Sequence, residues 1–300
     1  MAEAAPQQYD RETIQEPETP TYEAIVGQGT EHLSVETSYG QIEVTSDIGG
    51  PESKYKENQD SAFVVATQKS LSIGVIDGIG GGNGHRATIE ANKTFREMLL
   101  KGNSIKDSIY EVDTVLRHLD DRCAVTFAGA EIRHLMGREY EIDLAAIGDA
   151  RIITVRRGQA VPGGATEFQN TAHTLLKGSP FESEVYNHPL LNQTNGALGA
   201  EHVENTSLPQ FIRCKGYSGD VIVAASDGVW DSVSEFEITE ICKKFNVDAV
   251  NIEKAIFDLA IERNNRKDQF TIRHNLTTMV RKTSHKKGAD NVTVAVISLT

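Results

Sequence analysis

The chain has 300 residues, and its 30 lysines and arginines against 43 aspartates and glutamates give a net charge of −13. This length suits one large domain or two small ones with a substantial core. The acidic balance argues against DNA, RNA or an anionic membrane as the main partner, and an anionic substrate would need local positive charge from a metal ion or a few basic side chains.

The cysteine pattern and the absence of long apolar runs indicate a cytoplasmic protein. Cys123, Cys214 and Cys242 form no CxxC motif, so neither a disulfide framework nor a zinc site is indicated. The N-terminus has no apolar signal core, and no run of 18 apolar residues occurs anywhere. We therefore expect a soluble protein of the reducing cytosol that has no membrane partner.

The first half of the chain is predicted to hold a tail, then strands, then helices. Residues 1–30 are polar, acidic and proline-bearing, which predicts a disordered tail ahead of a domain that spans 31–300. Alternating or short apolar runs predict strands, and apolar residues at helical spacing predict helices. The strands are expected at 32–46 (a hairpin turning at Tyr39-Gly40), 62–66 and 71–76, and the helices at 86–100 and 104–118.

The second half is predicted to hold strands, two more helices and a last strand. Strands are expected at 123–132, 140–147, 151–155, 221–225 and 292–298, and helices at 232–245 and 248–263. Residues 163–200 are expected to form a surface flap, and 263–287 a loose basic stretch. Ser104 and Asp248 are the expected helix caps. A two-sheet sandwich with a helix pair on each outer side satisfies this order.

The turn after residues 73–76 is the most unusual stretch of the sequence. An apolar run ends in Asp77, and five glycines follow within the next seven residues. Three interpretations are open: an ordinary strand-to-helix loop, a phosphate-cradling loop, or a site for a hard cation held by Asp77 and the carbonyl of Gly78. The phosphate loop is disfavoured because GxxxxGK[ST] is absent and His85 stands where lysine would be needed.

Five aspartates share a place at a strand end or in the adjoining turn. They are Asp60, Asp77, Asp149, Asp227 and Asp290. Any one of them alone could be a turn residue or helix cap. If they converge, two carboxylates ~4 Å apart repel by roughly 4 kcal/mol at an effective dielectric near 20, so the group must protonate or bind metal. Oxygen ligands without paired His or Cys favour Mg²⁺ or Mn²⁺ over zinc.

Six motifs occur in a fixed order between about residues 42 and 299. They are Asn58-Gln59-Asp60, Val75-Ile76-Asp77-Gly78-Ile79-Gly80-Gly81, Ile147-Gly148-Asp149-Ala150-Arg151, His188-Pro189 with Ala197-Leu198-Gly199, Ala225-Ser226-Asp227-Gly228-Val229-Trp230-Asp231 and Asp290-Asn291-Val292-Thr293-Val294. In these motifs the chain resembles the metal-dependent serine/threonine protein phosphatases of type 2C. The resemblance implies an α+β fold, a four-layer α-β-β-α sandwich of two antiparallel sheets flanked by helix pairs, which agrees with the pattern above.

The resemblance also implies roles for the acidic residues. Asp77 would bridge two ions, and Gly78 would offer its carbonyl to one of them. Asp227 and Asp290 would hold the first ion, and Asp60 would support the second through water. In bacterial-type members a weaker third ion occurs, which Asp149 with Asp227 or Asp231 would match. Asn291 would position nearby groups, and 163–200 would match the segment beside the family's active site.

The implied reaction is hydrolysis of phosphoserine or phosphothreonine in a phosphoprotein, opposed by a kinase. Two ions ~3.5–4 Å apart lower the pKa of a water between them and clamp phosphoryl oxygens, so that the water attacks phosphorus in line. No covalent enzyme intermediate is required. The alternatives are a regulatory pseudophosphatase with little turnover and a phosphoester hydrolase that acts on small molecules.

Two positions depart from the family pattern. Many members grip the substrate phosphate with an arginine where Tyr55 stands, so Lys54 or Lys56 is the substitute we predict, although lysine is not bidentate. Ile79 replaces the histidine of eukaryotic members and places the chain nearer the bacterial-type branch, with His85 as an alternative proton donor. Trp230 is expected to pack in the core.

Overall fold

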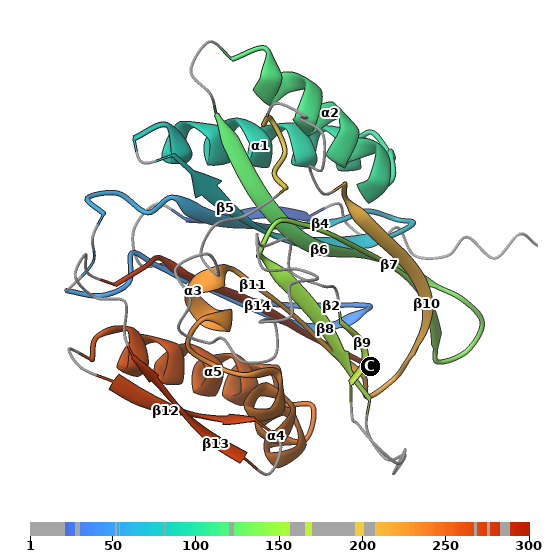
Figure 1. The fold of residues 1–300 in the computed structure, drawn as a ribbon. Helices are drawn as coiled ribbons and strands as arrows, with labels where there is room; N and C mark the ends of the chain where they lie inside the picture. The colour runs from blue at the N-terminus through green and yellow to red at the C-terminus, as the bar shows by residue number, and fades with distance from the viewer. Residues whose placement is uncertain are drawn as a thin grey trace, which may run out of the picture.

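Two antiparallel six-stranded sheets stack face to face, and helices cover the outer side of each (Figure 1). The protein is represented by a computed structural model that describes residues 22–27, 31–51, 53, 55–80, 82–119, 123–156, 166–169, 196–200, 208–266, 269–274, 277–282 and 289–300. The predicted α+β class and the four-layer α-β-β-α arrangement are confirmed.

Each sheet is assembled from strands that are distant in the sequence. The first has the order β1-β4-β5-β6-β7-β10, with bounds Tyr22–Val26, Asp60–Ala66, Leu71–Ile79, Ala124–His134, Glu139–Ile147 and Gln210–Tyr217. The second has the order β2-β3-β14-β11-β8-β9, with bounds Glu31–Thr37, Gly40–Asp47, Val292–Leu299, Val221–Ala225, Arg151–Val155 and Thr166–Gln169. A separate hairpin pairs β12 (Gln269–His274) with β13 (Thr277–Lys282).

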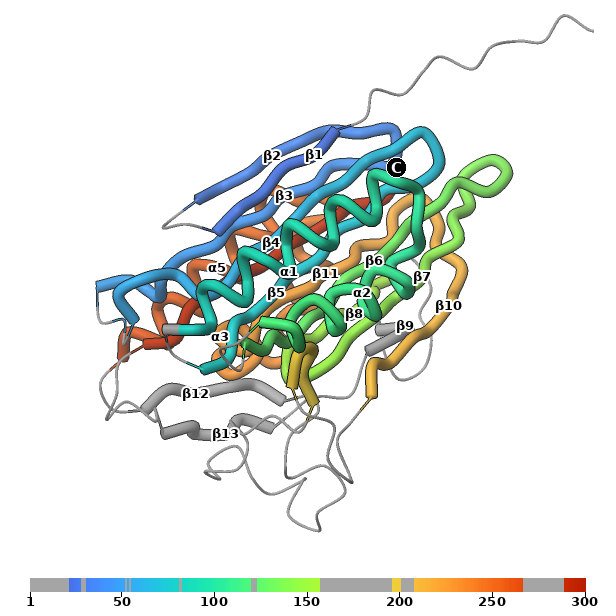
Figure 2. Tube along the Cα trace, turned by 90° about the horizontal axis from the view of Figure 1, so that it is seen from above, coloured from blue at the N-terminus to red at the C-terminus, as the bar shows by residue number. Residues whose placement is uncertain are grey.

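The helices form the outer layers. Helices α1 (Gly82–Leu100) and α2 (Ile105–Arg117) lie across the first sheet, as the view from above shows (Figure 2). Helices α4 (Glu235–Phe245) and α5 (Ala249–Asn264) pack on the second sheet through a shared apolar cluster. The short helix α3 (Asp227–Trp230) follows β11 directly. Each predicted helix pair therefore covers one sheet.

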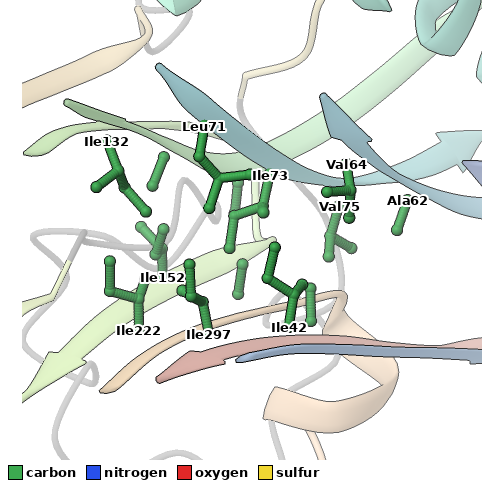
Figure 3. Packing of buried hydrophobic residues seen from close by; sticks show 14 of the residues in the cluster. Ile42, Ala62, Val64, Leu71, Ile73, Val75, Ile132, Ile152, Ile222 and Ile297 are labelled. Atoms are coloured by element: carbon green, nitrogen blue, oxygen red, sulfur yellow. The ribbon is translucent and has the colours of Figure 1, made fainter. Parts of the chain in front are cut away.

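The strand β4 illustrates how the layers are held together. All of its residues are buried, because Ala62 and Val64 face the space between the sheets while Phe63 and Val65 face α1 and α2. A strand covered on both faces reads as a continuous apolar run instead of an alternating one. Between the sheets, Ala62 and Val64 belong to one apolar cluster with Ile42 and Ile297 of the second sheet (Figure 3).

Both predicted helix caps are confirmed. The Ser104 hydroxyl accepts a hydrogen bond from the N–H of Asp107, and the Asp248 carboxylate accepts one from the N–H of Asn251. The helix predicted from 232 begins only at Glu235, because Ser234 forms a capping box with the side chain of Glu237.

Five strands were not predicted from the sequence. One is β9, which lies inside the expected flap and pairs with β8. The prediction of a disordered tail is wrong for Tyr22–Val26, which forms β1 and pairs with β4. The loose basic stretch contains β12 and β13, in which short runs of apolar and β-branched residues are followed by basic residues. The strand β10 was also not predicted, since its residues mix charge with apolar side chains.

Other predictions fall wholly or largely outside the described residues. These are the tail before residue 22, Lys54, and the flap apart from 166–169 and 196–200. Because β1 pairs with β4, the domain includes residues before the boundary predicted at residue 31, and the tail before residue 22 stays a prediction. Within the described part of the chain, no helix is both long and apolar enough to cross a bilayer.

Candidate metal centre

The five aspartates predicted at strand ends meet at one end of the two sheets. Asp60 starts β4 and lies opposite Asp77 of β5 in the register of the first sheet. Asp149 links β7 to β8, Asp227 follows β11 and Asp290 precedes β14. Burial is the largest cause of the raised pKa of the other four carboxyls, and the charge of Asp290 raises the pKa of each of them further. The four therefore lie within electrostatic reach of Asp290.

A chain of hydrogen bonds ties the Asn58-Gln59-Asp60 motif to the segment that carries Asp290. The backbone N–H of Gln59 donates to the side-chain oxygen of Asn291 at 2.9 Å. The Asn58 amide donates to the Ser46 hydroxyl at 2.7 Å and its oxygen accepts from the N–H of Asp60 at 3.0 Å. These bonds hold Asp60 in place by polar contacts that cross from one sheet to the other.

Two glycines after aspartates are required by close backbone packing. A Cβ on Gly78 would lie 2.4 Å from the carbonyl oxygen of Gly84, in the first turn of α1. A Cβ on Gly228 would lie 1.8 Å from the carbonyl oxygen of Asn291. Because any larger residue would push these segments apart, the repeated Asp-Gly pattern is a packing requirement that brings the aspartates together.

The protonation of the carboxyls reflects their mutual repulsion. The pKa of Asp60 is raised to about 7, mainly by burial and then by Asp290, against hydrogen bonds from Ser226 and Thr293 that lower it. The pKa of Asp149 is raised to about 6 by burial and by Asp231. Burial and neighbouring aspartates hold the pKa values of Asp77 and Asp227 well above their ordinary value. Without cations, part of this group must stay protonated near neutral pH.

Two of the carboxylate oxygens at this end have no hydrogen-bond partner. They are Asp60 Oδ2 and Asp149 Oδ1, and both atoms are buried. A buried acceptor left unpaired costs about 1–3 kcal/mol, so these oxygens are available to a ligand that brings positive charge.

No protein-family model and no curated protein sequence matches the chain. Among solved structures, a bacterial serine phosphatase superposes with a TM-score of 0.63 at 17% identity, covering 87% of this chain and 98% of its own. Stp1 from Staphylococcus aureus gives 0.63 at 19% identity, covering 90% and 98%. The serine/threonine phosphatase PstP/Ppp of Mycobacterium tuberculosis gives 0.56 at 21%, covering 86% and 97%.

The chain has the fold of the bacterial serine/threonine phosphatases. At these identities the similarity establishes the architecture. The predicted resemblance to a bacterial-type branch is therefore confirmed at the level of fold.

The acidic end of this phosphatase fold has the chemistry that hard divalent ions require. Its ligands are carboxylate oxygens, and two of those oxygens are buried without partners. Within the described residues, no three His, Cys, Asp or Glu side chains converge tightly enough to hold one ion by themselves. Mg²⁺ does not need that, because it keeps several waters and binds through one or two carboxylates. The residues present therefore fit Mg²⁺ or Mn²⁺.

Three further residues were predicted to belong to the site: Asp231, His85 and Lys56. Asp231 caps the C-terminus of α3, and its charge raises the pKa values of Asp149 and Asp227 after burial has done so. His85 is half-buried, and its Nδ1 lies 2.8 Å from the carbonyl oxygen of Asn58. Lys56 is exposed.

Trp230 packs as predicted in the core, where it is 5% exposed. Its indole Nε1 donates to the carbonyl oxygen of Ala225 at 3.0 Å and fixes α3 against the end of β11.

The sequence analysis missed three polar residues at this end. Ser226 and Thr293 lower the pKa of Asp60, and they are joined by a 3.1 Å hydrogen bond from the N–H of Thr293 to the Ser226 hydroxyl. The charge of Arg151 lowers the pKa of Asp149, against burial and Asp231. All three residues occur inside the six motifs, and their place in those motifs was the only feature of the sequence that could have indicated a role.

Proposed function

We propose that the chain is a metal-dependent protein serine/threonine phosphatase. The observation that carries the proposal is the meeting of five aspartates from distant segments at one end of a phosphatase fold, with Asp290 raising the pKa values of the other four after burial. A protein that needed this end only for stability would gain by pairing these carboxylates or replacing them, because buried like charges are costly.

We propose that two Mg²⁺ or Mn²⁺ ions bind at this end. Asp77 and the carbonyl of Gly78 would hold the ions together with Asp227 and Asp290, and waters would complete each coordination shell, since no three side chains of the described residues converge on one point. Asp60 supports the second ion through water, which fits its buried position and its hydrogen bonds from Ser226 and Thr293.

A third, weaker site would use Asp149 with Asp227 or Asp231. The unpartnered Oδ1 of Asp149 and the charge of Asp231, which raises the pKa of Asp149 after burial, support this pairing.

When bound, the ions supply an activated water for in-line attack and neutralise charge on the phosphoryl oxygens. The protein's own groups hold the ions and set the protonation of the site. The Asn58 carbonyl accepts from His85 Nδ1, so the neutral imidazole has its proton there and Nε2 is an acceptor. His85 would therefore serve as a proton donor only in its doubly protonated form.

The substrate class we propose is a phosphoserine or phosphothreonine protein made by an opposing kinase. The net charge of −13 is consistent with a substrate recruited through metal ions and not through a basic surface. We propose a cytoplasmic location and no nucleic-acid partner, as the composition and the scattered cysteines indicate.

The test is an assay of the purified full chain on p-nitrophenyl phosphate and on a phosphothreonine peptide, with Mn²⁺ and with chelator. Metal-dependent turnover of both substrates is expected. Mn²⁺ binding without turnover would instead indicate a regulatory pseudophosphatase, which the tyrosine at position 55 would favour. Turnover of small esters alone would indicate a small-molecule phosphoester hydrolase.

A further inference from the structure

A phosphatase of this type needs a cation that grips the substrate phosphate, and the expected position does not provide one. Tyr55 occupies that position, and Lys56 beside it is exposed. A single exposed lysine offers a point charge without the fixed geometry that a bidentate contact requires. A cation with fixed geometry must therefore come from another part of the acidic end.

Arg151 is a cation at this end that the metal-ligand assignment does not use. It is the first residue of β8, two residues after Asp149, and lies opposite Ala225 in the register of β11. Asp227 begins α3 two residues after Ala225. Arg151 therefore lies between the segment that carries Asp149 and the segment that carries Asp227.

The guanidinium of Arg151 is oriented but not paired. Its central carbon lies 5.8 Å from the centroid of the Trp230 ring, within the range of a cation–π contact. Its Nε atom is buried and has no hydrogen-bond partner, and among the described residues the guanidinium forms no ion pair. A buried donor without a partner is costly unless a ligand completes it.

Other arginines of the described chain are treated differently. Arg133 donates to Glu141, Arg156 to Asp220 and Arg263 to Glu237. These three guanidinium groups are partly buried, and each donates a hydrogen bond to a carboxylate. Arg151 differs from them because it has no such bond in the described part of the chain, although its charge acts on Asp149. Carboxylates that hold metal ions are not available to neutralise it.

We propose that Arg151 binds the phosphoryl group of the substrate and replaces the arginine that is missing at position 55. The inference rests on the proposed function and deepens it. A guanidinium presents parallel N–H donors that match two phosphoryl oxygens. Trp230 holds the guanidinium beside the acidic end. Because Nε is buried, the terminal N–H groups are the donors offered to a phosphoryl oxygen.

A purely electrostatic role makes a different prediction. If Arg151 only balanced the charge of Asp149, its removal would change the affinity for metal ions and leave the affinity of the metal-loaded protein for phosphate unaltered. If it binds phosphate, the reverse holds. Metal affinity and phosphate affinity must therefore be measured separately.

The experiment compares the full-length wild type with Arg151→Ala, Arg151→Lys and the control Arg213→Ala. Arg213 is exposed and paired with Asp143, so the control removes the same charge away from the acidic end. Mn²⁺ affinity is measured by calorimetry. Inorganic phosphate is then titrated into the Mn²⁺-loaded proteins, and KM and kcat are measured with the phosphothreonine peptide.

For Arg151→Ala, the phosphate Kd and the peptide KM are expected to rise about 10-fold to 100-fold, the loss of one or two charge-assisted hydrogen bonds. The kcat is expected to fall by no more than about fivefold, because the contact is made equally in the ground state and the transition state. The Mn²⁺ affinity is expected to stay within about threefold of the wild type, because Arg151 is not a metal ligand. Arg151→Lys keeps the positive charge but loses the parallel N–H donors of the guanidinium, so it should recover part of the phosphate affinity. Arg213→Ala should match the wild type.

A phosphate Kd within about twofold of the wild type in Arg151→Ala would overturn the inference, as would a change confined to Mn²⁺ affinity. If circular dichroism shows that Arg151→Ala does not fold, Arg151→Lys decides by the same titration, since it retains the stem and charge. A wild type that neither binds Mn²⁺ nor turns over either substrate would instead overturn the proposed function, a result distinct from failure at Arg151.

Discussion

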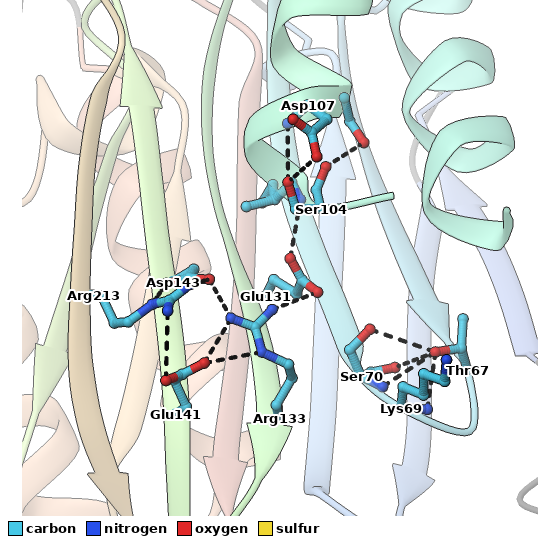
Figure 4. Close-up of polar contacts among 12 residues, drawn as sticks. Thr67, Lys69, Ser70, Ser104, Asp107, Glu131, Arg133, Glu141, Asp143 and Arg213 are labelled. Atoms are coloured by element: carbon cyan, nitrogen blue, oxygen red, sulfur yellow. Dashed lines mark hydrogen bonds and ion pairs between the residues drawn. The ribbon is translucent and has the colours of Figure 1, made fainter. Parts of the chain in front are cut away.

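Carboxylates gather at both ends of the first sheet, but only one of the two groups is neutralised by arginines. Near the start of β5, Arg133 of β6 forms ion pairs with Glu131, Glu141 and Asp143, and Arg213 of β10 adds a second guanidinium (Figure 4). Burial alone would raise the pKa of Asp143, but hydrogen bonds from Arg213 and Arg133 lower it overall. These acids stabilise the fold as anions.

The acidic end behaves in the opposite way. There burial raises the pKa values of Asp77 and Asp227, and further aspartates raise them again. Arg151, the arginine whose charge acts on Asp149, has no ion pair among the described residues. A carboxylate is thus a stabilising partner of arginine at one end and a source of repulsion at the other.

The contrast shows that the chain retains unpaired buried carboxylates at the acidic end at a cost to its stability. Natural proteins pair or replace buried charges unless another requirement keeps them. A divalent ion at the acidic end would do what Arg133 does at the other end, and it would also supply the proposed chemistry. The comparison therefore predicts that substitutions at the two ends have opposite effects on activity and stability.

The largest expected effect is on activity, from Asp227→Ala. Loss of a direct metal ligand should lower Mn²⁺-dependent turnover of the phosphothreonine peptide by roughly a thousandfold, the order expected for several kcal/mol of transition-state stabilisation. Melting in the presence of chelator should show that the variant is as stable as the wild type or more stable, because one repelling carboxylate is gone.

The matched control for Asp227→Ala is Asp143→Ala at the arginine-rich end. It should leave turnover within about twofold and lower stability, because it leaves Arg133 and Arg213 short of a partner. If Asp227→Ala retained full manganese-dependent turnover, the assignment of the metal ligands would be wrong.

The next effect is on stability, from Arg133→Met. Removing this cation leaves Glu131, Glu141 and Asp143 close together without it, and breaking such a partly buried network should cost about 2–4 kcal/mol of unfolding free energy. Urea denaturation measures the loss, and kcat should not change. A stable variant with impaired catalysis would mean that this end serves the active site as well.

A smaller effect is the pH dependence of the metal-free protein. Asp149 and Asp60 have pKa values of about 6 and about 7 in the folded state against an ordinary value of 3.8, so folding binds protons. Their contribution is fully present below about pH 4 and is lost as the pH rises through 6 and 7, of the order of 7 kcal/mol in total at about 1.4 kcal/mol for each pKa unit.

Urea denaturation in chelator at pH 5 and pH 7.5 tests this slope, and Asp60→Asn should flatten it. Mn²⁺ should stabilise the protein more at pH 7.5 than at pH 5, since it binds the ionised carboxylates. The paired Asp143 has a lowered pKa, so its contribution is present above about pH 4 and is lost only on acidification. A wild-type stability that rises steadily from pH 5 to pH 7.5 without metal would contradict the raised pKa values.

The smallest effect is expected from Lys56→Ala. The side chain is exposed, so its removal should change the peptide KM by less than about threefold. A tenfold rise in KM, with Arg151→Ala silent in parallel, would return the phosphate-binding role to the loop before Asn58, as the sequence alone had suggested.

The predictions made from sequence succeeded where neighbouring residues set the structure. Ser104 and Asp248 cap their helices because a hydroxyl or carboxylate one position before a helix is placed to accept from its first free N–H groups. The strands before Asp77 and Asp227 were recognisable because apolar runs between turns have a local signature. The strand Tyr22–Val26 was missed because its pairing with β4, and not its own composition, makes it a strand.

By itself, the sequence determined the four long helices, the strands with apolar runs and the aspartates that end those strands. Each of these depends on residues within a few positions of one another. Only the tertiary structure decided that Asp290 acts on the other four acids, that Gly228 must admit the backbone of Asn291, and that Arg151 has no ion pair among the described residues. Those properties come from burial and from contacts between distant segments, which a pattern of neighbours along the chain does not contain.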